Sequence, residues 1–166
     1  MFKTIKRVLF GSLSVLMIGI LVWILVLMNP AWSYAHQTTF GPVTIHHNQE
    51  FDPAAESILQ AAVEIIKSSE LYTTDFKVDL CMNDGSRFPN FHPFAGGLAY
   101  AFGDKAVFYN AVPNFSQNTA QNKSLPADRL GEKANLTWLL AHEFTHNLQF
   151  SWDLLFPMKY EFWQQE

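Results

Sequence analysis

The pattern of apolar and polar residues divides the chain into an N-terminal apolar segment and a mixed segment behind it. A predominantly apolar run extends from Val8 to Met28, interrupted only by Gly and Ser residues and preceded by three basic residues. At about 1.5 Å rise per residue, such a run spans the roughly 30 Å hydrocarbon core of a bilayer. We therefore predict a membrane anchor in residues 1–28, a linker in residues 29–37 and one domain in residues 38–166.

A cleaved signal peptide is the alternative interpretation of the N-terminal run. The apolar core of a signal peptide is usually about 7–15 residues long and is followed by a small-residue cleavage site. Ser33-Tyr34-Ala35 would serve as such a site, but the length of the run favours an anchor. No basic residue follows the run before Lys67, so the positive-inside rule predicts a cytoplasmic N-terminus and an extracytoplasmic domain, secreted if the segment is cleaved.

Beyond the anchor, segments with strand periodicity alternate with helical segments. Apolar residues at helical spacing predict helices over Ala54–Ser69 and Leu136–Phe150, with Asp52 and Asn135 as their N-caps. The polar segment Asn114–Lys133 is predicted to be a loop. Strands are predicted where apolar residues alternate with polar ones or where short apolar runs flank a turn: Phe40–His47, Phe76–Met82, Gly96–Phe102 and Lys105–Ala111. This order predicts an α+β domain with a small mixed sheet.

The charge distribution narrows the class of partner. The part beyond the anchor carries all fifteen acidic residues and eight of the eleven basic ones, which gives it a formal charge of −7. Such a charge argues against nucleic acid or an anionic membrane surface as a partner. Cys81 is the single cysteine, so no internal disulfide can form, and its apolar strand predicts a buried hydrophobe rather than a nucleophile.

The second predicted helix contains the chain's candidate metal chemistry. His142 and His146 have Glu143 between them in an H-E-x-x-H pattern. Residues four apart lie on one helix face, so both imidazoles can reach one zinc ion at Zn–N distances of about 2.0–2.1 Å. The metal lowers the pKa of a bound water towards about 7, and Glu143 would take the proton as the water attacks a carbonyl. A chance match is disfavoured, because the pattern falls on a predicted helix with uncharged neighbours. Without a metal or hydrogen bonds, two histidines and a glutamate in such a helix would be buried polar groups without a partner, which is costly.

A zinc site of this kind needs a third protein ligand. The metzincin pattern would require Gly at position 149 and His at position 152, where this chain has Gln149 and Trp152. A downstream glutamate is the remaining option, as in zinc peptidases with two histidines and one glutamate. The candidates are Glu161 and Glu166.

The segment HEFTHNLQ followed by FWQQE resembles the gluzincin metallopeptidases, in which H-E-x-x-H precedes W-x-x-E. The resemblance implies Glu166 rather than Glu161 as the third ligand, Zn²⁺ as the cofactor and a thermolysin-like catalytic fold. It also makes Lys105–Ala111 the best candidate for the strand along the substrate cleft, with an ordinary strand of the sheet as the equal alternative. Because the family pattern continues through the glutamate helix to an oxyanion-stabilising residue, we expect this sequence to be the N-terminal part of a longer protein.

These features predict a membrane-anchored, exported zinc metallopeptidase that hydrolyses peptide or protein substrates with metal-activated water. Its site would comprise His142, His146 and Glu166 as zinc ligands and Glu143 as the catalytic base. A non-catalytic binding or assembly protein on the same fold is the alternative, because fold does not determine function. An intramembrane protease is disfavoured, since the motif helix has polar flanks and the sequence has one run of membrane length. Three histidines outside the motif are weak candidates for a metal role, His46, His47 and His92, whereas His36 lies in the predicted linker and gives no indication.

Overall fold

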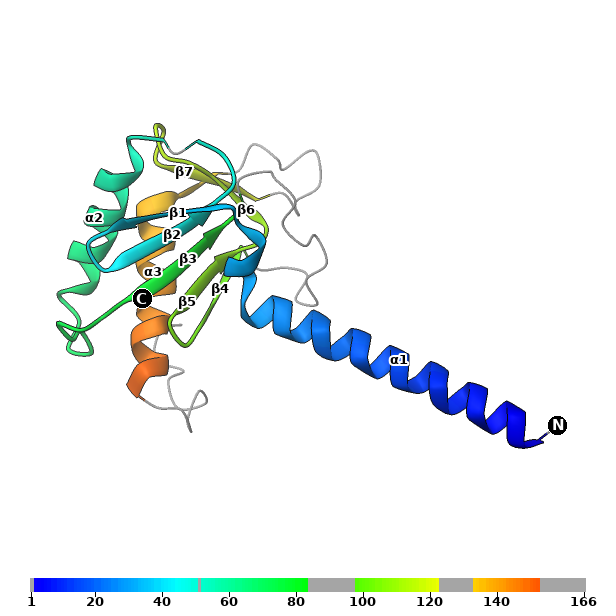
Figure 1. The fold of residues 1–166 in the computed structure, drawn as a ribbon. Helices are drawn as coiled ribbons and strands as arrows, with labels where there is room; N and C mark the ends of the chain where they lie inside the picture. Colours follow the sequence, from blue (N-terminus) through cyan, green and yellow to red (C-terminus); the bar gives the residue numbers. More distant parts are fainter. Residues whose placement is uncertain (1, 51, 84–97, 123–132, 153–166) are drawn as a thin grey trace.

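The computed structural model describes residues 2–50, 52–83, 98–122 and 133–152 of the chain (Figure 1). It has the mixed α+β architecture that the sequence predicts, with an apolar N-terminal helix and a small mixed sheet. Its elements in chain order are α1 (Phe2–Met28), η1 (Pro30–Ser33), β1 (His36–Phe40), β2 (Val43–His47), α2 (Ala55–Ile66), β3 (Val78–Met82), β4 (Ala99–Phe102), β5 (Lys105–Phe108), β6 (Ala111–Asn114), β7 (Thr119–Asn122), β8 (Lys133–Asn135) and α3 (Leu136–Trp152).

Helix α1 is predominantly apolar after its basic first turns and stands apart from the domain. The window Leu9–Val26 is long and apolar enough to cross a membrane, and none of it is buried against the rest of the protein. Figure 1 shows α1 projecting away from the sheets. An apolar helix without a packing partner suits a membrane span or a signal sequence, as the sequence predicts.

The larger sheet has five strands in the order β1-β2-β3-β5-β4. Its three central strands are parallel to one another, and β1 and β4 pair antiparallel at the two edges. Gly41 and Gly103 lie in the turns of the two edge hairpins at φ +55° and +60°, a conformation that glycine adopts without steric cost. Of the first hairpin, the sequence predicted β2 but not β1, because β1 has the polar sequence HQTTF without alternating apolar residues.

A second, antiparallel sheet of three strands has the order β6-β7-β8. Its middle strand, Thr119–Asn122, lies inside the segment that the sequence predicts to be a loop, so that prediction was wrong for these residues. The sequence TAQN is polar and buries only Ala120, which leaves no hydrophobic period to detect. The strand is held by pairing with both neighbours rather than by its own propensity.

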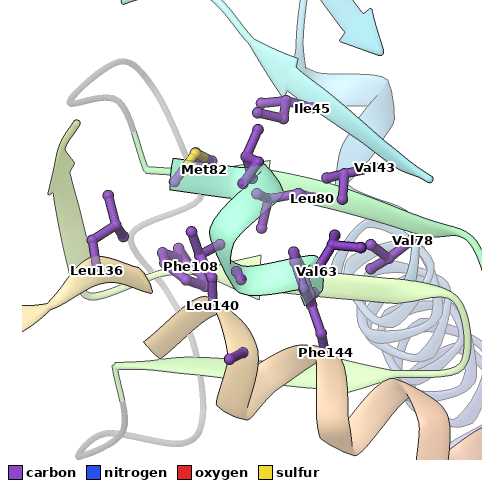
Figure 2. Packing of buried hydrophobic residues seen from close by; sticks show 14 of the residues in the cluster. Val43, Ile45, Val63, Val78, Leu80, Met82, Phe108, Leu136, Leu140 and Phe144 are labelled. Atoms are coloured by element: carbon purple, nitrogen blue, oxygen red, sulfur yellow. The ribbon is translucent and has the colours of Figure 1, made fainter. Parts of the chain in front are cut away.

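The main core lies between the five-stranded sheet and the two helices α2 and α3 (Figure 2). Alternate residues of the central strands point into it, and both helices contribute an apolar stripe. Burying each of these large side chains stabilises the fold by about 1.5–3 kcal/mol. Its largest fully buried side chains are Phe108, Phe144, Ile45, Leu59, Ile66, Leu80, Leu136, Leu140, Leu148, Val43 and Val78.

The opposite side of the five-stranded sheet, called the outer face here, carries a smaller apolar cluster. Cys81, Val107 and Tyr109 are buried there, and Ala31 and Tyr34 pack against them. Cys81 is fully buried, as predicted, and burial raises the pKa of its thiol to about 12. The segment predicted as a linker, residues 29–37, therefore includes η1 and the start of β1 and is packed on the sheet.

Candidate metal centre

Helix α3, which carries the H-E-x-x-H pattern, is fixed at its N-terminus by two asparagines. Asn135 is the N-cap that the sequence predicts, since its Oδ1 accepts a hydrogen bond of 3.0 Å from the N–H of Trp138. Asn118, in the turn between β6 and β7, accepts hydrogen bonds from the N–H and Oγ1 of Thr137 at 3.0 and 2.9 Å. Asp52, by contrast, accepts from the N–H of Ala54 in a turn just before α2 and does not cap that helix.

The buried and exposed sides of α3 divide the motif residues between them. Leu136, Leu140, Phe144 and Leu148, spaced four residues apart, fill the core. Glu143 and Asn147 are also buried, and the two motif histidines lie at the exposed rim. The helix thus exposes both imidazoles and buries the side chain of Glu143.

The imidazoles of His142 and His146 converge. Their Nε2 atoms are 3.1 Å apart, and the rings meet edge-on with centroids 4.6 Å apart. A tetrahedral zinc ion with Zn–N bonds of about 2.0–2.1 Å holds two nitrogens about 3.3 Å apart, so the pair fits one ion with little movement. The same 3.1 Å also suits a hydrogen bond between the rings in the metal-free protein.

The side chain of Gln149 orients His146. Its Oε1 lies 3.0 Å from His146 Nδ1, and because a carbonyl oxygen only accepts, Nδ1 carries the proton. The lone pair of the neutral ring is then on Nε2, the atom that faces His142. Metal-binding histidines usually donate their other N–H to such an acceptor. Sequence reasoning used Gln149 only to exclude the metzincins, although its position three residues after His146 places it within reach.

The side chain of Glu143 is buried, and one of its carboxylate oxygens has no hydrogen-bond partner in the part of the chain that the structure describes. The residue is 5% exposed, and the oxygen concerned is Oε2. Burial raises the pKa of Glu143 to about 7, and burial together with His146 lowers the pKa of His142. An unpaired buried carboxylate is costly, and a nearby cation with a bound water would offset that cost. The donor set and this orphaned oxygen therefore fit a zinc ion.

Asn147 joins α3 to the hairpin between β4 and β5. Its Nδ2 donates to the carbonyl oxygens of Gly103 and Lys105 at 2.9 and 2.8 Å. In addition, the rings of Phe102 and Phe150 are in contact in a tilted arrangement, with centroids 4.7 Å apart. These contacts hold the end of β4 against the motif helix. The sequence did not predict this role of Asn147, although a polar residue among apolar neighbours on the helix indicates a buried hydrogen-bonding side chain.

The strand that the family resemblance implied for the cleft is not an edge strand. β5 (Lys105–Phe108) lies between β3 and β4, so its backbone is paired on both sides, and Phe108 is fully buried. That prediction was wrong, because strand order cannot be read from one sequence. β4 (Ala99–Phe102) is the edge strand of the described sheet that packs against α3.

The predicted third ligand falls outside the described residues, as do Glu161, His92 and the W-x-x-E segment that ends in Glu166. Among residues 2–50, 52–83, 98–122 and 133–152, no group of three or more His, Cys, Asp or Glu side chains converges. Residues of the first hairpin lie away from α3: His46 is on the outer face, and His47 is hydrogen-bonded to Thr38 and to the carbonyl of Gln49.

Comparison with known proteins assigns no relative to this chain. No protein-family model matches it, and no curated protein or solved structure is significantly similar to it. The thermolysin-like arrangement implied by the two motifs thus stays a prediction, and the functional argument depends on the geometry of α3 and of the elements around it.

Proposed function

We propose that this chain is a membrane-anchored zinc peptidase whose domain lies outside the cytoplasm. The observation that carries the proposal is the convergence of two imidazole Nε2 atoms, 3.1 Å apart, on the helix that also buries Glu143, whose Oε2 has no hydrogen-bond partner among the described residues. Helix α1, which is apolar enough to span a membrane, would be the anchor, with the basic N-terminus in the cytoplasm.

Each motif residue then has a defined task. His142 and His146 would hold the zinc ion through Nε2, Gln149 fixes the orientation of the second ring, and Glu166 is proposed as the third ligand. The ion would supply Lewis-acid activation of a water molecule. Glu143, next to the first ligand in sequence and screened from solvent, would act as the general base and then return the proton to the leaving amine.

The substrate would lie along the edge strand β4. An edge strand offers unpaired backbone N–H and C=O groups, with which an extended peptide can form β-sheet hydrogen bonds. β4 packs on α3, and Asn147 ties the turn at its end to that helix. The substrate backbone would therefore be held beside the motif helix, which positions a carbonyl near Glu143.

The first experiment separates metal binding from catalysis. Zinc content is measured by atomic spectroscopy on the purified chain and on His142→Ala, with His36→Ala as a matched control on the exposed strand β1. We expect near-stoichiometric zinc in the parent and the control, and its loss in His142→Ala. Zinc that is absent from the parent, or retained by His142→Ala, would overturn the site.

The second experiment tests the role of Glu143 with a general peptide substrate. Glu143→Gln should keep its zinc and lower kcat by about 10²- to 10⁴-fold, because the general base is removed and the ligands are untouched. Glu56→Gln, on the exposed side of α2, is the control and should behave like the parent. Bound zinc without measurable hydrolysis in the parent would instead support a non-catalytic binding protein on the same fold.

A further inference from the structure

The segment that follows α1 is docked on the outer face of the sheet. Tyr34 Oη donates to the carbonyl of Met82 at 2.9 Å, and the ring of Tyr34 packs beside Cys81 and Val107. The side chain of Asn48 also holds this segment: Oδ1 accepts a hydrogen bond of 2.8 Å from the N–H of Ala35, and Nδ2 donates to the carbonyl of Ser33 at 3.5 Å. Only Asn29 separates α1 from this packed segment, so the domain and the helix are joined without a flexible spacer.

Trp32 lies in this segment and points outward, with 76% of its surface exposed. Beside it is a hollow of about 410 Å³, lined by Trp32, Tyr34, His36, Gln37 and His46 together with Ala31 and Ala35. None of these residues is a Lys, Arg, Asp or Glu. At the floor of the hollow, His46 is 8% exposed, and its Nε2 lies 3.4 Å from Asp79 Oδ1 without a hydrogen bond among the described residues.

Trp32 and the hollow lie close to the end of the apolar helix α1, which indicates what can contact this surface. α1 ends at Met28, and Trp32 follows four residues later in a short 3-10 helix that rises about 2.0 Å per residue, so Trp32 lies within about 8 Å of the end of the apolar helix. The interfacial layer on each side of a bilayer is about 5–8 Å thick. Tryptophan and tyrosine are enriched in that layer, because an apolar ring with a polar tip matches it.

We propose that Trp32 and the adjacent hollow dock on the lipid headgroup layer of the bilayer that α1 spans, so that the domain lies directly on the membrane. The contact uses aromatic and uncharged polar side chains, which makes it independent of anionic lipids and compatible with an acidic domain. Helix α3 packs on the other side of the sheet (Figure 1), so the sheet separates the metal centre from the lipid. The proposal rests on retention of α1 and not on the zinc site.

The experiment uses an environment-sensitive nitrobenzoxadiazole label on the full chain in phosphatidylcholine vesicles, with retention of α1 verified by mass spectrometry. The label is attached at Trp32→Cys, and the matched control is Trp138→Cys, which is 67% exposed on α3. Native Cys81 is fully buried and does not compete for the label. His36→Cys, also exposed and lining the hollow, is a second reporter.

We expect the labels at positions 32 and 36 to show blue-shifted emission. Quenching by nitroxide-headgroup lipids should be about threefold stronger at these positions than at position 138, as for side chains at headgroup depth. Equal quenching at all three positions, or solvent-like emission at position 32, would overturn the proposal. Removal of α1 during export would overturn it as well. Zinc content is unaffected in either case, so failure here is distinguishable from failure of the metal site.

Discussion

Among single residues, Gln149 has the most direct influence on the proposed zinc ligands, because it accepts the hydrogen bond from His146 Nδ1. Gln149→Met keeps the size of the side chain and removes the acceptor. We expect zinc affinity to fall about 10- to 100-fold with the fold intact, as is typical when the partner of a metal-binding histidine is lost. Competition with a chromophoric chelator measures the affinity. Gln60→Met, exposed on α2, is the control, and an unchanged affinity in Gln149→Met would contradict the orienting role.

Cys81 gives a pH-dependent prediction at the same scale. Burial raises the pKa of its thiol from 9.0 to about 12, so between these values the unfolded chain loses a proton that the folded protein keeps. Stability must therefore fall as pH rises through this window, by about 1 kcal/mol between pH 8 and 10 from this group. Guanidinium unfolding at both pH values measures the change, and Cys81→Ala should show a smaller decrease than the parent. A decrease of the same size in both proteins would show that Cys81 contributes none of it.

At the scale of elements, local sequence predicted the helices better than the strands. The caps and apolar spacing of α3 are local signals, and the helix begins at the predicted residue, Leu136. The position of β5 in the sheet depends on pairing between residues far apart in sequence, and so the strand expected along the cleft was the wrong one. The polar strand β7 lacked any period to read. Pairing with distant strands determines both the position of β5 and the formation of β7, and this pairing cannot be read from a single sequence.

Substitution of Asn147 tests whether its hydrogen bonds hold β4 to α3. In Asn147→Ala, the carbonyls of Gly103 and Lys105 lose their donor, and we expect a loss of about 1–3 kcal/mol in the free energy of unfolding. Hydrogen exchange should accelerate in β4 and its turn more than in β2, which lies far from the substitution in the sheet. Gln60→Ala is the exposed control, and a uniform acceleration over both strands would argue against a local tie.

For the whole molecule, the sequence predicted an apolar N-terminal helix and a mixed α+β part, but it did not predict that residues of the linker pack on the sheet. A short polar segment with Pro30 has the composition of a linker. Its packing depends on contacts to Met82 and Asn48, which are distant in sequence. The candidate site was predictable to the extent that it is local: the spacing within α3 predicts two ligands and a base on one helix, whereas the orphaned Glu143 oxygen and the tie to β4 needed the tertiary structure.

The boundary of the domain can be tested by two truncations. Residues 29–166 keep the contacts that the packed segment makes with the sheet and with Asn48, because the apolar window of α1 is not buried against the domain. Residues 36–166 lose Tyr34 and Ala31 from the outer face and expose the cluster around Cys81. We expect the shorter protein to be less stable by about 2–4 kcal/mol, from the lost apolar burial and the hydrogen bond to Met82. Guanidinium unfolding followed by circular dichroism compares them in one buffer. Equal midpoints would mean that residues 29–35 act as a tether, and the rigid connection between the helix and the domain would then be excluded.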